Sequence, residues 1–143
     1  MIPGEVISMS KYYWERGDSA VAYIDTAGKL SARLQTSCAN VNHKKYTFYG
    51  LQKLYTTAEE LCDLCHLVNR LNLNDPRQAQ ERAVVLQRAR AKLDYLVHLM
   101  SRTTDRIDFS EGVLFEISTL MEKEDKLLSG LQKSDAERRR KMR

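Results

Sequence analysis

The sequence is poor in the residues that make tight turns, with six glycines and two prolines among 143 residues. An all-β fold needs such residues at short, regular intervals, so their scarcity argues against one. The glycines are scattered singly, and the sequence has no Gly-rich loop of the kind that holds phosphates. It has no repeat of solenoid length either. These absences favour a single domain of helices joined by short connections.

Long apolar runs are missing as well, and none approaches the roughly 20 residues that cross a membrane. The N-terminal stretch, MIPGEVISMSKYYWERGD, has no basic flank followed by an apolar block, which is the pattern of a secretory signal. The three cysteines are an odd number, which without an export signal indicates reduced thiols. We therefore expect a cytoplasmic protein that does not contact a membrane.

The stretch from Asp75 to Asp105 has the pattern of one long helix. Asp75 is a good N-cap, and Pro76 suits the first helical position, where a missing N–H costs nothing. At a rise of about 1.5 Å per residue, such a helix is roughly 40 Å long and needs partners of similar length. Apolar residues recur three or four apart and predict one buried stripe: Ala79, Ala83, Leu86, Ala89, Leu93, Leu96, Val97 and Met100.

Three other stretches can supply those partners. Apolar spacing predicts one helix over about 19–40 and another over about 47–71. A last helix follows the turn after the central one, with Ser110 or Asp108 as its cap, and ends near residue 133.

Four amphipathic helices with short connections predict an all-α fold, an antiparallel up-down-up-down four-helix bundle. We expect an N-terminal arm at 1–18, the bundle at 19–133 and a frayed, basic C-terminal tail at 134–143.

No arrangement of side chains suggests catalysis. Ser101, Cys38 and the three histidines have no neighbours that would activate them. A carboxylate-bridged metal pair in a bundle needs a Glu-x-x-His on each of two helices, and the sequence has none. We expect a protein that is not an enzyme and has no catalytic residue, metal site or cofactor. The glutamates fall mainly on polar faces and are interpreted as solvated: Glu59, Glu60, Glu111, Glu116, Glu122 and Glu124.

One short motif offers an alternative, because Cys62, Cys65 and His66 form the C-x-x-C-H signature of covalent haem attachment. Helical bundles can hold haem between their helices. The two cysteines also continue the apolar stripe that begins at Leu54, where free cysteine behaves as a small buried hydrophobe. Core thiols are therefore the preferred interpretation, and a haem-binding bundle is a lesser alternative.

The formal charge of +4 is modest, so its placement matters more than its size. Basic residues line the central helix and recur in ERRRKMR at the end of the sequence, a pattern that favours a polyanion such as RNA or DNA. The plainer alternative is a solvated helix face with a basic tail. We expect contacts with nucleic acid or a polymerase from Lys44, Lys45, Arg77, Arg82, Arg88, Arg90, Lys92, Arg138, Arg139 and Arg140.

Three runs follow one another between about residues 43 and 133: HKKYTFYGLQKLYTTAEELCDLCHLVNRLN, the Arg-rich helix with KLDYLVHLM, and RIDFSEGVLFEISTLMEKEDKLLSGLQK. In order and pattern they resemble the four-helix-bundle family of accessory variability determinant proteins. The resemblance implies a basic homopentamer without enzymatic activity. It also implies that the protein binds the reverse transcriptase of a diversity-generating retroelement and its RNA or DNA, in support of mutagenic retrohoming.

The sequence departs from that family in three places. Residues 1–42 match only as a first helix, the RRRKMR ending has no counterpart, and Leu131 stands where an aromatic residue is common. Bundle proteins encoded within intervening sequences of ribosomal RNA genes share the fold and would imply a protein–protein interaction module. Their Ile-Ala-Glu-Gly type motif is missing here, so this family is the second choice.

Overall fold

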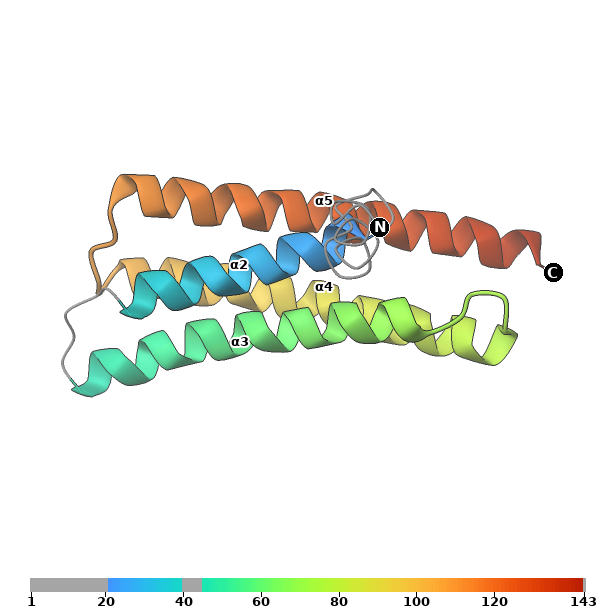
Figure 1. The fold of residues 1–143 in the computed structure, drawn as a ribbon, viewed down its shortest axis with the longest axis horizontal. Helices are drawn as coiled ribbons and strands as arrows, with labels where there is room; N and C mark the ends of the chain where they lie inside the picture. The colour runs from blue at the N-terminus through green and yellow to red at the C-terminus, as the bar shows by residue number, and fades with distance from the viewer. Residues whose placement is uncertain (1–20, 40–44, 143) are drawn as a thin grey trace, which may run out of the picture.

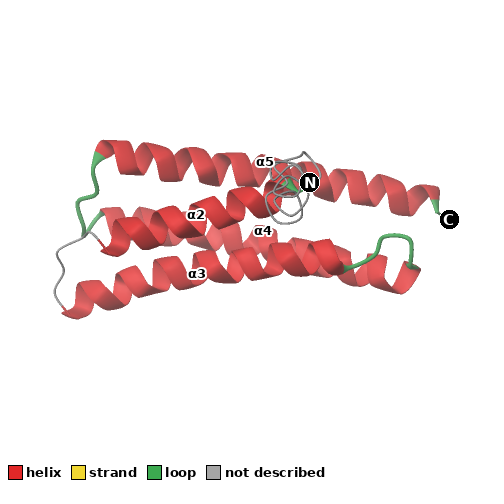
Figure 2. Cartoon of the chain, viewed as in Figure 1, coloured by secondary structure: helices red, strands yellow, loops and turns green. Residues whose placement is uncertain are grey.

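The computed structural model describes residues 21–39 and 45–142, and every regular element in these two ranges is a helix (Figure 2). The helices are α2 (Ala22–Ala39), α3 (Lys45–Arg70), α4 (Pro76–Thr104) and α5 (Glu111–Lys141). Helix α2 contacts α3 and α5, and α4 also contacts α3 and α5, so the four helices close into a ring (Figure 1). The predicted four-helix bundle is confirmed.

The caps of the two longest helices are those that the sequence predicts. The Asp75 carboxylate accepts a hydrogen bond from the backbone N–H of Arg77 at 3.1 Å, and Pro76 is the first residue of α4. The hydroxyl of Ser110 accepts from the backbone N–H of Val113 at 3.2 Å and so caps α5. Ser110, rather than Asp108, is therefore the N-cap of α5.

The core consists mainly of leucine at helical spacing, but the predicted stripe of α4 differs from the buried one at two positions. Ala83 is only half-buried and Val97 is exposed, whereas Val85 and Leu99, which the stripe left out, are buried. Val97 is 44% exposed, whereas Leu99 is 6% exposed and belongs to the core. Val97 lies at the edge of α4 toward α5, beside a hollow that Met121 also lines. Leu99 follows Lys92 by seven residues, so it lies on the edge of α4 that faces α3.

Helix α5 is longer than predicted, because it continues past residue 133 through Lys141. Asp135 is buried in this extension and holds it against α4. Residues 134–141 are therefore helical and not a frayed tail. The predicted arm at 1–18 lies outside the described residues, as do Lys44 and the side chain of Lys45. No described helix has both the length and the apolar character that a membrane span requires.

Candidate nucleic-acid interface

Three arginines lie along the outer, exposed face of α4, and most of the buried leucines of this helix lie on its other side. Arg77, Arg88 and Arg102, here called the outer arginines, are all exposed. Their separations of 11 and 14 residues bring them to nearly the same side of an α-helix, about 38 Å from first to last. None of the three forms an ion pair with a residue in 21–39 or 45–142. Their charges are therefore open to solvent and to a partner.

Exposed apolar and aromatic side chains lie between these arginines on the same face. Val84 is 51% exposed and Tyr95 is 38% exposed. Of the two acidic residues of α4, Glu81 lies on this face together with the three arginines, whereas Asp94 lines the hollow toward α5. The outer face of α4 is therefore basic with exposed apolar patches, which suits a phosphate backbone.

Positive charge also gathers at one end of the bundle. Arg70 ends α3, Arg77 lies in the first turn of α4, and the last turn of α5 carries the basic run 138–141. Figure 1 shows the C-terminal end of α5 extending past the start of α2, at the same end as the α3–α4 connection. Arg138, Arg140 and Lys141 are exposed there, although Arg140 and Lys141 each lie 3.8 Å from Glu137. We call this region the basic end.

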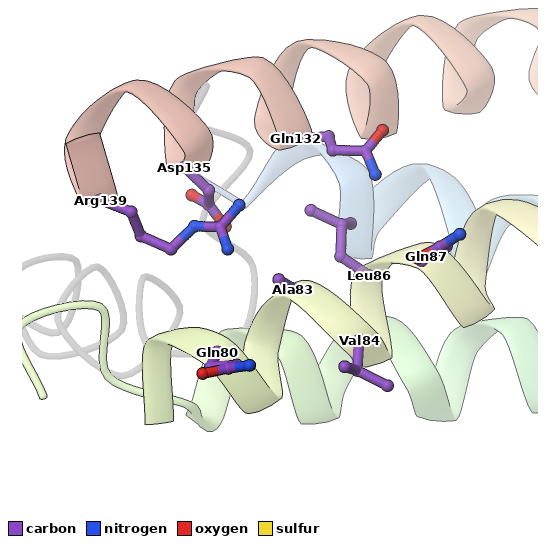
Figure 3. A pocket seen from close by; sticks show the side chains of 8 residues that line it. All are labelled: Gln80, Ala83, Val84, Leu86, Gln87, Gln132, Asp135 and Arg139. Carbon is purple, nitrogen blue, oxygen red and sulfur yellow. The ribbon is translucent and has the colours of Figure 1, made fainter. Parts of the chain in front are cut away.

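Arg139 differs from its neighbours, because it lies in a groove between α4 and α5. Two hollows of about 260 and 330 Å³ adjoin there, and both are lined by Gln80 and Arg139. In Figure 3 the Arg139 side chain extends from α5 toward α4, above Gln80 and Ala83. Its Nε is buried and has no hydrogen-bond partner among the described residues. The wall of the groove thus contains a buried donor without a described partner, close to the basic end.

The sequence placed Arg82 on the exposed face of α4, but its side chain is mostly buried. Its guanidinium forms a salt bridge with Asp135 at 2.7 Å and also donates to the carbonyl oxygens of Val68 and Leu71, at 3.1 and 3.2 Å. The exposed fractions of the Arg82 and Asp135 side chains are 12% and 5%. Arg82 therefore ties α3, α4 and α5 together in the interior, and its guanidinium is occupied by these internal contacts rather than open to a binding partner.

Arg90 and Lys92 also have partners within the bundle. The Arg90 guanidinium donates to the Gln132 side chain and lies 4.0 Å from Asp125, both on α5. Lys92 Nζ lies 2.7 Å from Glu60 Oε2 on α3. Because these ion pairs neutralise the two cations, they are weaker candidates for phosphate contacts than the outer arginines.

The interior of the bundle contains a carboxyl group that the sequence analysis assigned to a polar face. Glu124 is fully buried, and its Oε2 accepts from Cys65 Sγ at 3.8 Å while its Oε1 has no partner among the described residues. Burial raises the pKa of Glu124 to about 8, and the contact with Cys65 opposes part of that rise. The buried hydroxyls of Tyr23 and Thr26 on α2 likewise lack described partners.

The cysteines behave as core residues. Cys65 and Cys38 are buried, Cys62 is half-buried, and burial raises the pKa of the Cys38 thiol to about 11. No group of three metal-ligating side chains forms within the described ranges. Haem attachment through Cys65 would have to displace core packing around Glu124, so the structure gives the haem alternative no support.

The buried polar residues were not among the expected core residues, although their spacing indicates burial. Glu124 lies seven residues after Ile117 and four before Leu128, which are both core positions. In the same way, Arg82 lies three residues after Ala79 and four before Leu86, which are also buried. Arg102 was not among the expected site residues either, and its position on the outer face follows from its spacing to Arg88 and Tyr95.

Comparison with protein-family models, with curated proteins and with solved structures finds no match to this chain.

Proposed function

We propose that this protein is a non-catalytic adaptor that binds the phosphate backbone of RNA or DNA through the outer face of α4 and the basic end. One observation carries the proposal: the outer arginines are exposed and unpaired with described residues, whereas the other basic residues of α4 form ion pairs with side chains of α3 or α5. Guanidinium groups pair well with phosphate oxygens, and Arg77 links the two basic regions.

The proposed binding is weakly selective for sequence. Contacts to phosphate position a protein on nucleic acid but do not identify bases. Affinity should fall steeply with salt, because each neutralised phosphate releases condensed counterions. The arginines provide the donors for such contacts, while a helix face about 38 Å long spans several phosphates.

The family resemblance adds partners to the proposal. We propose a homopentamer that binds a retroelement reverse transcriptase together with its RNA or DNA. Five copies of a chain of formal charge +4 give +20 in total, which would produce a much stronger field for a polyanion than one copy. Exposed apolar residues such as Val84 and Phe115, which is 73% exposed, offer contact area for protein partners. The interaction module of the ribosomal-RNA intervening-sequence type is the alternative, and it would need no nucleic acid.

A matched pair of triple variants tests the proposal. The first replaces the outer arginines as Arg77→Gln, Arg88→Gln and Arg102→Gln. The control replaces three exposed lysines of α5 as Lys123→Gln, Lys126→Gln and Lys133→Gln, so it removes the same charge from another helix. Fluorescence anisotropy with a short RNA duplex at low salt measures both.

We expect the outer-arginine variant to bind at least about tenfold more weakly and the lysine control to change less than about threefold. Equal losses in both variants, or no binding by the unaltered protein, would contradict the proposal. Light scattering coupled to size exclusion gives the mass of the assembly. A monomer in all conditions would contradict the proposed homopentamer.

A further inference from the structure

A hollow of about 400 Å³ lies between the outer edges of α3 and α4. Tyr95 and Lys92 line it from α4, and Gln52, Lys53, Thr56 and Glu60 line it from α3. Its volume falls in the range of small-molecule sites. The hollow is independent of the α4–α5 groove, with which it shares no lining residue.

The Tyr95 ring is the flat surface of this hollow. The ring is partly exposed, and Lys53 Nζ lies 5.8 Å from its centroid, within the range of a cation–π contact. Lys53 forms no ion pair with a described residue, so its ammonium can move from the ring to a phosphate. An aromatic ring beside a mobile cation is the arrangement on which unstacked bases bind in single-stranded nucleic acid.

The polar lining suits the edge of a base. Glu60 is a carboxylate acceptor for exocyclic amino groups, and its own charge is balanced by Lys92 at 2.7 Å. Gln52 offers both an amide donor and an amide acceptor. Because these groups offer both donors and acceptors, the hollow can accept more than one base, and stacking on Tyr95 would contribute most of the affinity.

Tyr95 also lies between two of the outer arginines. It is seven residues from Arg88 and seven from Arg102, which places one arginine about 10 Å to either side along the helix. A strand held by these two arginines therefore passes over the hollow. In a duplex the bases are paired and stacked, so they cannot turn into it.

We propose that the Tyr95 hollow binds one unstacked base of single-stranded RNA or DNA, stacked on the tyrosine ring, with Lys53 contacting a neighbouring phosphate. This inference rests on the proposed function, since the outer arginines bring the strand to the hollow. It gives the protein a preference for single strands over duplexes.

The test compares three labelled probes: an oligothymidylate strand, an abasic strand of the same length and a short RNA duplex. Tyr95→Ala removes the stacking surface, and Tyr95→Phe keeps it. Phe115→Ala is the matched control, because it removes an exposed aromatic residue from α5. Circular dichroism verifies that all variants remain helical.

We expect Tyr95→Ala to bind oligothymidylate about five- to twentyfold more weakly, while its affinity for the abasic strand and the duplex stays within about twofold. Tyr95→Phe and Phe115→Ala should resemble the unaltered protein on every probe. If Tyr95→Ala binds oligothymidylate normally, or loses all three probes equally, the hollow is not a base site. The proposed function fails separately, if the unaltered protein binds none of the three probes or if replacing the outer arginines leaves binding of all three unchanged.

Discussion

Arg82 and Arg88 lie fewer than two turns apart on α4, yet they belong to regions with opposite roles. Arg82 is enclosed by Asp135 and by the ends of α3, so its charge stabilises the interior. Arg88 is exposed and has no described ion partner, so its charge faces solvent. The formal charge of a helix therefore has to be divided into an internal part that holds the bundle together and an external part that can bind a partner.

The largest expected effect comes from breaking the internal pair. Arg82→Ala leaves Asp135 buried and unpaired, and we expect the free energy of unfolding to fall by about 3–5 kcal/mol. Urea unfolding followed by circular dichroism measures the change. Arg88→Ala is the control on the same helix and should lie within about 0.5 kcal/mol of the unaltered protein.

The double variant Arg82→Met with Asp135→Leu removes both buried charges and should recover most of the lost stability. If Arg82→Ala and Arg88→Ala destabilise equally, the division between interior and exterior charge does not hold.

The second effect concerns the other buried carboxyl group, that of Glu124. Its pKa rises from 4.5 to about 8 on folding, so between these values the folded state keeps a proton that the unfolded state has lost. The free energy of unfolding should therefore fall as the pH rises from about 5 to 8, and this contribution should become constant above that range.

Glu124→Gln keeps the shape of the side chain but cannot ionise, so it should lose most of this pH dependence. Glu124→Leu also removes the unpartnered oxygen, and we expect it to stabilise the protein by about 1–3 kcal/mol at pH 8 and by less at pH 5. Thermal unfolding across this pH range measures both variants. If the free energy of unfolding of Glu124→Gln changes with pH as much as that of the unaltered protein, Glu124 is not the source of the pH dependence.

The smallest effect is expected at the boundary between the two regions. Lys92 and Glu60 form an ion pair in which the side chains are 30% and 49% exposed. We expect Lys92→Met to change the free energy of unfolding by less than about 1 kcal/mol, because solvent screens such pairs. If Lys92→Met lowers the free energy of unfolding as much as Arg82→Ala does, the Lys92–Glu60 pair stabilises the bundle in the same way as the buried Arg82–Asp135 pair.

Much of the fold could be predicted from the sequence, whereas the division between internal and external charge could not. The helical spacing of apolar residues predicted the four helices, and the capping residues predicted the start of α4 at Pro76. Both features are determined by local chemistry. The interior positions of Arg82 and Glu124 were missed, since charged residues are usually exposed and the spacing signal was given less weight than the residue type. The sequence also did not predict that Arg90 and Lys92 pair across the bundle, because those contacts depend on how the helices pack.

The salt dependence of RNA binding tests the central claim most directly, namely that the outer arginines carry the external charge. We would measure the affinity of the unaltered protein and of the triple outer-arginine variant for a short RNA duplex over a series of salt concentrations. We expect the variant to reduce the steepness of the slope of log affinity against log salt by about 2–3, since up to three phosphate contacts are lost. An unchanged slope would contradict it and would place the phosphate contacts elsewhere on the protein.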